Sequence, residues 1–143
     1  MDVFLANEQG LPLDETRLMA LASHTLSTED VDDEAELSIL VIDAEHMRTL
    51  NARFASNDYA TDVLAFPMME EDDDALILGD VVLCPEVAAG NAQRLKRTLE
   101  SELDVLVVHG TLHLLGYDHQ GSTDKARMET RVRAVLESFT GAP

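Results

Sequence analysis

The chain has 143 residues, 45% of them hydrophobic and 27% charged, which are proportions typical of a globular protein. This length suffices for one domain with a core and is too short for two, so we expect a single domain over residues 1–143. Lys and Arg number 10 against 28 Asp and Glu, a formal net charge of −18 at pH 7. Such a field repels nucleic acid and anionic membranes at long range, so we expect no DNA partner, and any anionic substrate needs a local basic patch.

The cysteine content and the length of the apolar segments indicate the cellular compartment of the protein. Cys84 is the only cysteine, so an intrachain disulfide is excluded. The first residues lack the basic region and long apolar run of a signal peptide. No apolar stretch approaches the ~20 residues that a membrane span requires. We therefore expect a cytoplasmic protein with no membrane partner.

The first part of the chain alternates strand-like and helical patterns. In chain order, the predicted elements are a strand at 3–7, a helix at 13–26, a strand at 36–43, a helix at 43–54, and strands at 61–67 and 76–85. Asp43 is a suitable N-cap for the second helix. Acidic residues cluster at 28–36 and 69–74, and both segments are predicted to be exposed loops.

Beyond Pro85 the spacing of apolar residues is helical almost to the end of the chain. The predicted helices are 86–100, 101–116 and 122–139. Ser101 opens the second of them and Gly116 closes it, since glycine is favoured just past helix ends. Strands and helices that alternate early and give way to helices predict an α/β (α+β) fold. We expect a small, mostly parallel sheet of about four strands packed with about five helices.

Three histidines occur within the stretch HGTLHLLGYDH at residues 109–119. His109 and His113 are four residues apart, so on a helix they lie on one side and can bind one ion. Glycine at position 116 ends the helix, and the short turn after it can bring His119 back to the pair. A histidine on an apolar helix is usually a hydrogen-bonded core residue, but two imidazoles in a buried helix are costly without strong partners. The pattern therefore predicts a metal site on the penultimate helix and the turn after it.

The donor set indicates the ion and the class of chemistry. Three imidazoles leave one tetrahedral position open, as in catalytic zinc sites. Zinc suits an all-imidazole site, although copper or nickel would also bind. Zinc peptidases of the metzincin group share the spacing HxxxHxxGxxH, but they have glutamate as general base directly after the first histidine. Here that residue is Gly110, which cannot accept a proton and is expected to leave space beside the metal.

The stretch at 109–119 resembles the signature HGxLHLxGYDH of the YbeY family of bacterial endoribonucleases. The resemblance extends to TDVLAFP at 61–67 and LGDVVLCPE at 78–86, and covers the chain from about residue 36 onward. It implies a single metal-dependent hydrolase domain with one zinc ion bound by His109, His113 and His119. It also implies that the substrate is single-stranded RNA. The roles implied are maturation of ribosomal RNA, notably at the small-subunit 3′ end, and ribosome quality control.

One position departs from the family pattern. Many members have an arginine, thought to contact substrate phosphate, six residues before the Thr-Asp of TDVLAFP. In this chain that position is Ala55, and the nearest arginine is Arg53. Arg53 is our candidate catalytic residue, because guanidinium matches phosphate in a bidentate manner. The alternative is a solvated surface arginine.

The remaining candidates concern proton transfer and RNA affinity. Asp118, beside His119, is expected to accept the second N–H of a metal-bound imidazole, and direct proton transfer is the alternative. Asp80, beside Gly79, could approach the site from the sheet, and a turn at this pair of residues is the alternative. The candidate phosphate contacts are Arg53, the run at 93–97, Lys125, Arg127, Arg131 and Arg133.

Arg127 and Arg131 share one helix face and could mark an RNA-binding surface. The alternative is that Glu129 pairs with Arg133. In that case the charged side chains of this helix only keep an exposed face in contact with water.

Three functions fit these residues. The first is a zinc-dependent endoribonuclease specific for single strands. The second is a ribosome-assembly factor with a structural metal and negligible nuclease activity, whose acidic surface contacts ribosomal proteins or other assembly factors. The third is hydrolysis of another ester or amide, as in a metallopeptidase.

Overall fold

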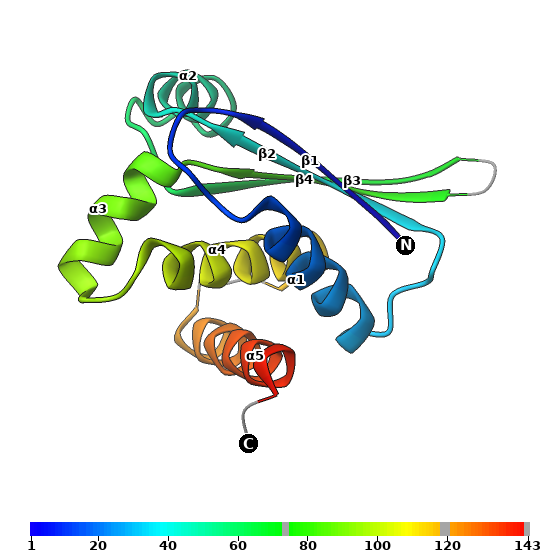
Figure 1. Ribbon diagram of the computed structural model, residues 1–143. Coiled ribbons are helices and arrows are strands. Elements are labelled where there is room, and N and C mark those ends of the chain that lie inside the picture. Colours follow the sequence, from blue (N-terminus) through cyan, green and yellow to red (C-terminus); the bar gives the residue numbers. More distant parts are fainter. Residues whose placement is uncertain (73–74, 118–120, 142–143) are drawn as a thin grey trace.

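The computed structural model describes residues 1–72, 75–117 and 121–141 (Figure 1). Within these ranges the elements are β1 (Asp2–Glu8), α1 (Glu15–Thr28), β2 (Ala35–Ile42), α2 (Ala44–Ala55), β3 (Val63–Asp72), β4 (Ala75–Leu83), α3 (Pro85–Leu95), α4 (Leu99–Leu114) and α5 (Ser122–Thr140). Side chains fix several helix starts. Asp43 accepts a hydrogen bond from the His46 backbone N–H, as predicted for the N-cap of α2.

The strands of the described residues form one sheet in the order β1-β2-β4-β3. β1, β2 and β4 are parallel, and β3 runs antiparallel to β4 at the edge. The predicted fold, a small and mostly parallel sheet with about five helices, is confirmed. Parallel neighbours require crossover connections, which α1 provides between β1 and β2.

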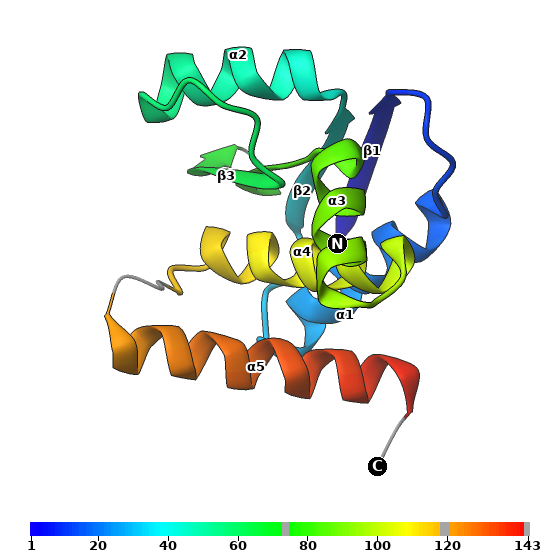
Figure 2. The same cartoon turned by 90° about the vertical axis from the view of Figure 1, so that its left-hand side faces the viewer.

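The helices form layers on both faces of this sheet. α1 and α4 cover one face, α5 lies outside them, and α2 crosses the opposite face near one end (Figures 1 and 2). The main core lies between the sheet and the helix pair α1 and α4. Alternate residues of β2, namely Leu37, Ile39 and Val41, are buried there, because side chains in a strand alternate between faces. A smaller cluster around Met47 and Val82 lies beneath α2.

A β-bulge at Gly79 changes which face the side chains of β4 occupy. Leu78 and Val81 both face the main core, although strict alternation would put them on opposite faces. Gly79 has φ +137°, and a Cβ there would lie 2.2 Å from the Phe66 carbonyl oxygen. Only glycine fits this backbone. After the bulge, Asp80 points to the open face of the sheet.

Three predicted boundaries are corrected by the structure. The helix expected at 86–100 ends at Leu95, where the chain turns through Lys96 in a left-handed conformation. The next helix starts at Leu99, capped by the Thr98 hydroxyl, which accepts from the Ser101 backbone N–H. The acidic segment 69–74 was expected to be a loop, but β3 continues to Asp72 and β4 begins at Ala75. Backbone pairing in the β3–β4 hairpin therefore outweighs the charge repulsion along this segment.

α4 is the central helix of the fold. It packs against α1, α3, α5 and the strands β3 and β4. Thr111 is buried within it, and its hydroxyl donates to the Val107 carbonyl oxygen at 2.7 Å. Among the described residues, no helix is both long enough and apolar enough to cross a membrane.

Candidate metal centre

α4 has one stripe that is less buried than the rest of the helix. From Glu102 to Leu114 its residues are buried, except for Val105, His109 and His113, which are half-buried. These three recur every four residues, so they lie along one side of the helix. Both predicted metal-binding histidines of α4 therefore share its only partly exposed side within this span.

Gly110 lies on the sheet-facing side of α4, about 100° around the helix axis from His109. A Cβ at this position would come within 2.7 Å of Val81 Cγ1 and 3.4 Å of Val63 Cγ2. The expectation that Gly110 leaves space beside the metal is wrong. Its lack of a side chain instead lets α4 approach β3 and β4 closely.

The C-terminal turn of α4 forms as the sequence predicts. Gly116 has φ +103°, and its N–H donates to the His113 carbonyl oxygen at 3.0 Å. The Tyr117 N–H donates to the Leu112 carbonyl oxygen at 3.2 Å. These bonds satisfy the last carbonyl groups of the helix and turn the chain away from its axis.

A polar cluster fixes the chain just after this turn. The Tyr117 hydroxyl donates to the Glu29 carboxylate at 3.1 Å, and Arg131 pairs with the same carboxylate. Arg131 also donates to the Thr28 carbonyl oxygen at 3.2 Å. Burial, together with the hydrogen bond to Glu29, raises the pKa of Tyr117, and the hydrogen bond to Glu29 raises the pKa of Arg131. The cluster joins the end of α1 to α5 and to the residue that precedes 118–120.

The other predicted residues of the metal centre, His119 and Asp118, lie outside the described residues. Within the part of the chain that the structure describes, no three His, Cys, Asp or Glu side chains form a group that could hold a metal ion. The structure does show two half-buried imidazoles, His109 and His113, on one side of α4. Two imidazoles on one helical stripe suit a borderline-soft divalent ion such as zinc. Gly116 turns the chain directly before the segment with the third histidine.

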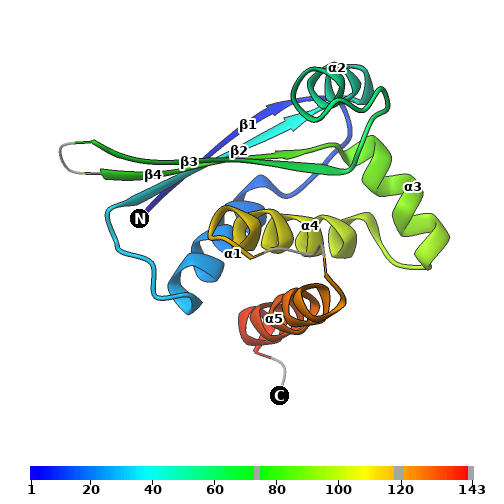
Figure 3. The ribbon, with the colours of Figure 1, turned by 180° about the vertical axis from the view of Figure 1, so that it is seen from behind.

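The stripe of α4 borders a groove between α4 and α5. These two helices lie side by side, with α5 on the side of α4 away from the sheet (Figure 3). The groove has a volume of about 490 Å³, and His109 and Val105 line it from α4. One of the two imidazoles, that of His109, is therefore accessible from this groove.

Arg53 lies in the last turn of α2 and is exposed. Its guanidinium carbon stands 5.5 Å from the centre of the Phe54 ring, a cation–π contact. α2 and α4 lie on opposite faces of the sheet (Figure 2). The structure therefore brings His109 and His113 together and does not bring Arg53 against them. Ala55, the position of the family arginine, is the last residue of α2.

The predicted basic face of α5 is divided by the fold. Arg131 is half-buried and contacts Glu29 and Thr28, so its charge serves packing between α1 and α5. Arg127, one turn earlier, is exposed. Arg133 and Lys125 line the groove beside α4, and Glu129 lies between them on the same stripe. The helical spacing did not reveal which of these cations face a neighbouring element.

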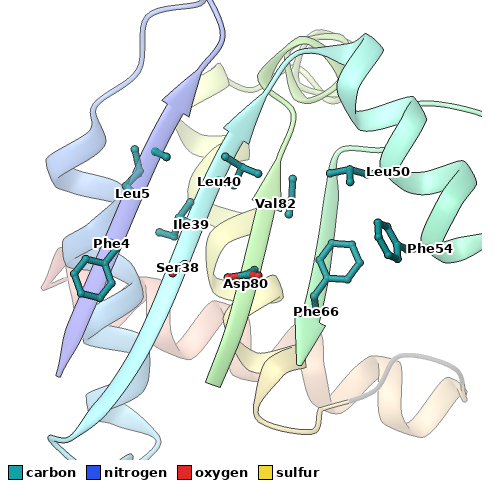
Figure 4. A pocket seen from close by; sticks show the side chains of 11 residues that line it. Phe4, Leu5, Ser38, Ile39, Leu40, Leu50, Phe54, Phe66, Asp80 and Val82 are labelled. Atoms are coloured by element: carbon teal, nitrogen blue, oxygen red, sulfur yellow. The ribbon is translucent and has the colours of Figure 1, made fainter. Parts of the chain in front are cut away.

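A second hollow of about 460 Å³ lies on the open face of the sheet. Phe4, Ser38, Asp80 and Phe66 form one cross-strand row across β1, β2, β4 and β3 (Figure 4). Burial raises the pKa of Asp80. Because this face is turned away from α4, Asp80 does not approach the histidines, contrary to one of our expectations.

Sequence reasoning missed the sheet-face hollow, although a signal for it exists. Phe4 is 55% exposed and Phe54 is 60% exposed, and both stand at this hollow. The strands carry apolar residues on both faces, whereas α2 is the only described helix that lies over the open face. Such a pattern indicates an apolar surface that is partly uncovered.

Comparisons with known proteins extend over almost the whole chain. The family described as Endoribonuclease YbeY matches residues 4–140. The endoribonuclease YbeY of Thermobifida fusca is 46% identical over 146 residues, which cover 97% of this chain and 94% of that protein. That of Salinispora tropica is 42% identical over 151 residues, covering 97% and 96%. A solution structure from Thermotoga maritima has a TM-score of 0.62 and 28% identity, and the match covers 100% of this chain and 94% of that one.

Proposed function

The chain belongs to the YbeY family of endoribonucleases, and on this premise we propose that it is a zinc-dependent endoribonuclease specific for single-stranded RNA. We propose that it acts in the cytoplasm on ribosomal RNA, in maturation of the small-subunit 3′ end and in ribosome quality control. The main structural support is the half-buried stripe of α4, which carries His109 and His113 and presents His109 to the groove beside α5. In this proposal residues 1–143 form one metal-dependent hydrolase domain.

In this proposal His109, His113 and His119 hold one zinc ion per chain. The pair on α4 supplies two nitrogen donors from one helical side, and the third donor follows Gly116 by three residues in the sequence. When bound, zinc acts as a Lewis acid and activates water at neutral pH. Asp118 is proposed to accept the second N–H of a zinc-binding imidazole and so hold its ring in one orientation.

Arg53 is proposed to contact a phosphate of the substrate. A guanidinium presents several N–H donors to a phosphate at once, which stabilises negative charge on its oxygens. Because α2 and α4 lie on opposite faces of the sheet, this role requires the RNA strand to pass around the edge strand β3. The exposed position of Arg53 allows such contact.

The net charge of −18 favours a second candidate function. An acidic surface attracts basic ribosomal proteins or other assembly factors and repels RNA. In that case the protein is a ribosome-assembly factor with a structural metal and negligible nuclease activity. A peptidase has less support, because Gly110 lacks a carboxylate and packs against Val81.

Metal content and RNA cleavage, measured on the same preparations, test the proposal. We expect about one zinc per wild-type chain by elemental analysis, and we expect His113→Ala to lose both the zinc and cleavage of a single-stranded oligoribonucleotide. The matched control is His46→Ala, on an exposed histidine of α2. If His113→Ala stays folded and keeps full cleavage, the zinc-dependent mechanism is wrong. Zinc binding without any wild-type cleavage favours the assembly factor.

The role of Arg53 has its own test. Arg53→Ala is expected to lower cleavage at unchanged zinc content and unchanged stability. Arg48→Ala is the control, because Arg48 lies on the same helix and its exposed guanidinium pairs with Asp58 at 2.8 Å. Equal activity of the two variants and the wild type would remove Arg53 from the mechanism.

A further inference from the structure

The groove between α4 and α5 has an apolar floor and a charged rim. Met128, Val132 and Leu136 recur at helical spacing along α5 and form the floor with Val105 of α4. Met128 and Val132 are buried, whereas Leu136 and Val105 are half-buried. The floor is therefore an apolar surface that remains open to a ligand.

The rim of the groove is positive in a strongly acidic protein. On α5, Lys125 and Arg133 lie along a helical stripe next to the floor residues, and Glu129 lies between them on that stripe. Arg97 approaches the groove from the α3–α4 connection and pairs with the buried Glu102 at 3.5 Å. In the described part of the chain, no carboxylate forms an ion pair with Lys125 or Arg133. Three of the chain's ten cations thus line one groove against a single rim carboxylate.

We propose that this groove is a nucleotide subsite that binds the RNA strand next to the metal centre. Lys125 and Arg133 contact a backbone phosphate, while the base of the same nucleotide packs on the apolar floor. The groove volume of about 490 Å³ lies within the roughly 300–1,000 Å³ that is typical of small-ligand sites. His109 lines the same groove, so a strand bound there leads to the stripe that holds both imidazoles. This inference rests on the proposed function, since it assigns a subsite to the proposed substrate.

The other cations on the last helix do not form an equivalent surface. Arg131 is committed to Glu29, and Arg127 borders a different surface hollow that also contains Asp124. A phosphate near Arg127 therefore meets a carboxylate and lacks an apolar floor beside α4. The groove beside His109 is the better site for a nucleotide because charge, apolar surface and access to an imidazole coincide there.

A pair of double variants with equal loss of charge tests the subsite. Lys125→Gln with Arg133→Gln removes the two rim cations, and Arg97 is left in place because Glu102 is buried against it. The control is Arg94→Gln with Arg127→Gln, two exposed cations outside the groove. The zinc-loaded full chain is titrated into a fluorescein-labelled 2′-O-methyl oligouridylate, which resists cleavage, and anisotropy gives Kd at several salt concentrations.

We expect the groove double variant to raise Kd roughly tenfold, while the control stays close to the wild type. The slope of log affinity against log salt should become shallower by roughly 0.7, because the two cations share one phosphate and a single-strand phosphate contact contributes about 0.7. Glu129→Gln should act in the opposite direction and tighten binding. Equal weakening in both double variants would show a net-charge effect and overturn the subsite, as would no weakening in either.

Binding and cleavage separate the failure of this inference from the failure of the proposed function. Absence of wild-type cleavage on unmodified RNA would contradict the nuclease, yet a difference in Kd between the double variants would still support the groove. Cleavage with identical Kd values in all variants would keep the nuclease and remove the subsite. Displacement of the oligouridylate by poly-glutamate at equal charge concentration would also overturn it, because the groove would then bind any polyanion.

Discussion

The two hollows of this protein have similar volumes, about 490 Å³ between α4 and α5 and about 460 Å³ on the open sheet face, but opposite charge. Among the described residues that line the sheet-face hollow, Asp80 is the only ionisable one, and aromatic rings stand beside it. The groove beside α4 instead has Arg97, Lys125 and Arg133 at its rim. The net charge of −18 is thus a poor guide to local binding chemistry. A few cations, placed together by packing, give an acidic chain a surface suited to an anion.

The bulge at Gly79 is the feature on which the sheet-face hollow depends most. Gly79→Ala combines a left-handed φ with a Cβ 2.2 Å from the Phe66 carbonyl oxygen, so we expect it to reduce the free energy of unfolding by about 3–5 kcal/mol. Urea denaturation measures the change.

Gly90→Ala is the control for this change. Gly90 lies within α3, and a Cβ there meets nothing within 4 Å, so the variant should be more stable by about 0.5–1 kcal/mol. A Gly79→Ala protein as stable as the wild type would mean that the bulge is not required.

Glu29 is the corresponding anchor of the groove, because it holds α5 through Arg131 and the end of α4 through Tyr117. Glu29→Gln replaces two charge-assisted hydrogen bonds by weaker ones, and we expect a loss of about 1–2 kcal/mol. The oligouridylate affinity should fall with it, since α5 forms one wall of the groove. Glu34→Gln, on an exposed residue of the next loop, serves as the control. Unchanged stability and affinity in Glu29→Gln would show that α5 does not need this anchor.

A smaller effect is expected at the aromatic edge of the sheet-face hollow. Phe54 and Phe66 pack edge to face, with ring centres 5.6 Å apart and planes at 77°. Phe54→Ala should cost about 0.5–1.5 kcal/mol in thermal or urea denaturation and leave oligouridylate affinity unchanged. A marked loss of RNA affinity in this variant would show that RNA binds at the sheet-face hollow and not in the groove between α4 and α5.

The smallest effect depends on pH. Burial raises the pKa of Asp80, so the folded protein binds this proton more tightly than the unfolded chain does. Stability therefore falls as pH rises through the window from the unfolded pKa to the raised folded pKa, and the loss persists above it. Asp80→Asn removes this loss, so we expect the variant to gain stability over the wild type at neutral pH and to show no gain in acid.

Asp58 provides a control of opposite sign for this pH dependence. The hydrogen bond from Arg48 lowers the pKa of Asp58, so its contribution is present at neutral pH and is lost as pH falls through the lowered pKa. Asp58→Asn should therefore lose stability at neutral pH. Denaturation series across pH measure both variants, and a parallel response of the two would refute the assigned causes.

Much of the architecture follows from local sequence. Apolar spacing predicted the strands, the helices and the mostly parallel sheet, because periodicity reports which residues share one side of an element. The same reasoning put His109 and His113 on one side of a helix and predicted a glycine turn just past its end, and both features are present, with the helix ending at Leu114. Local hydrogen bonds and backbone freedom determine such features, and few distant residues take part.

Tertiary packing decided what each side of an element meets. Gly110 faces Val81, and Arg131 pairs with Glu29, which is 102 residues away in the chain. The groove likewise combines a cation from the α3–α4 connection with cations of α5, and the bulge at Gly79 turns Asp80 to the open face. Spacing along a chain does not say which element will cover a given side, because this depends on how whole layers pack. The sequence by itself therefore determined the elements and the histidine pair, while only the tertiary structure decided which charges surround them.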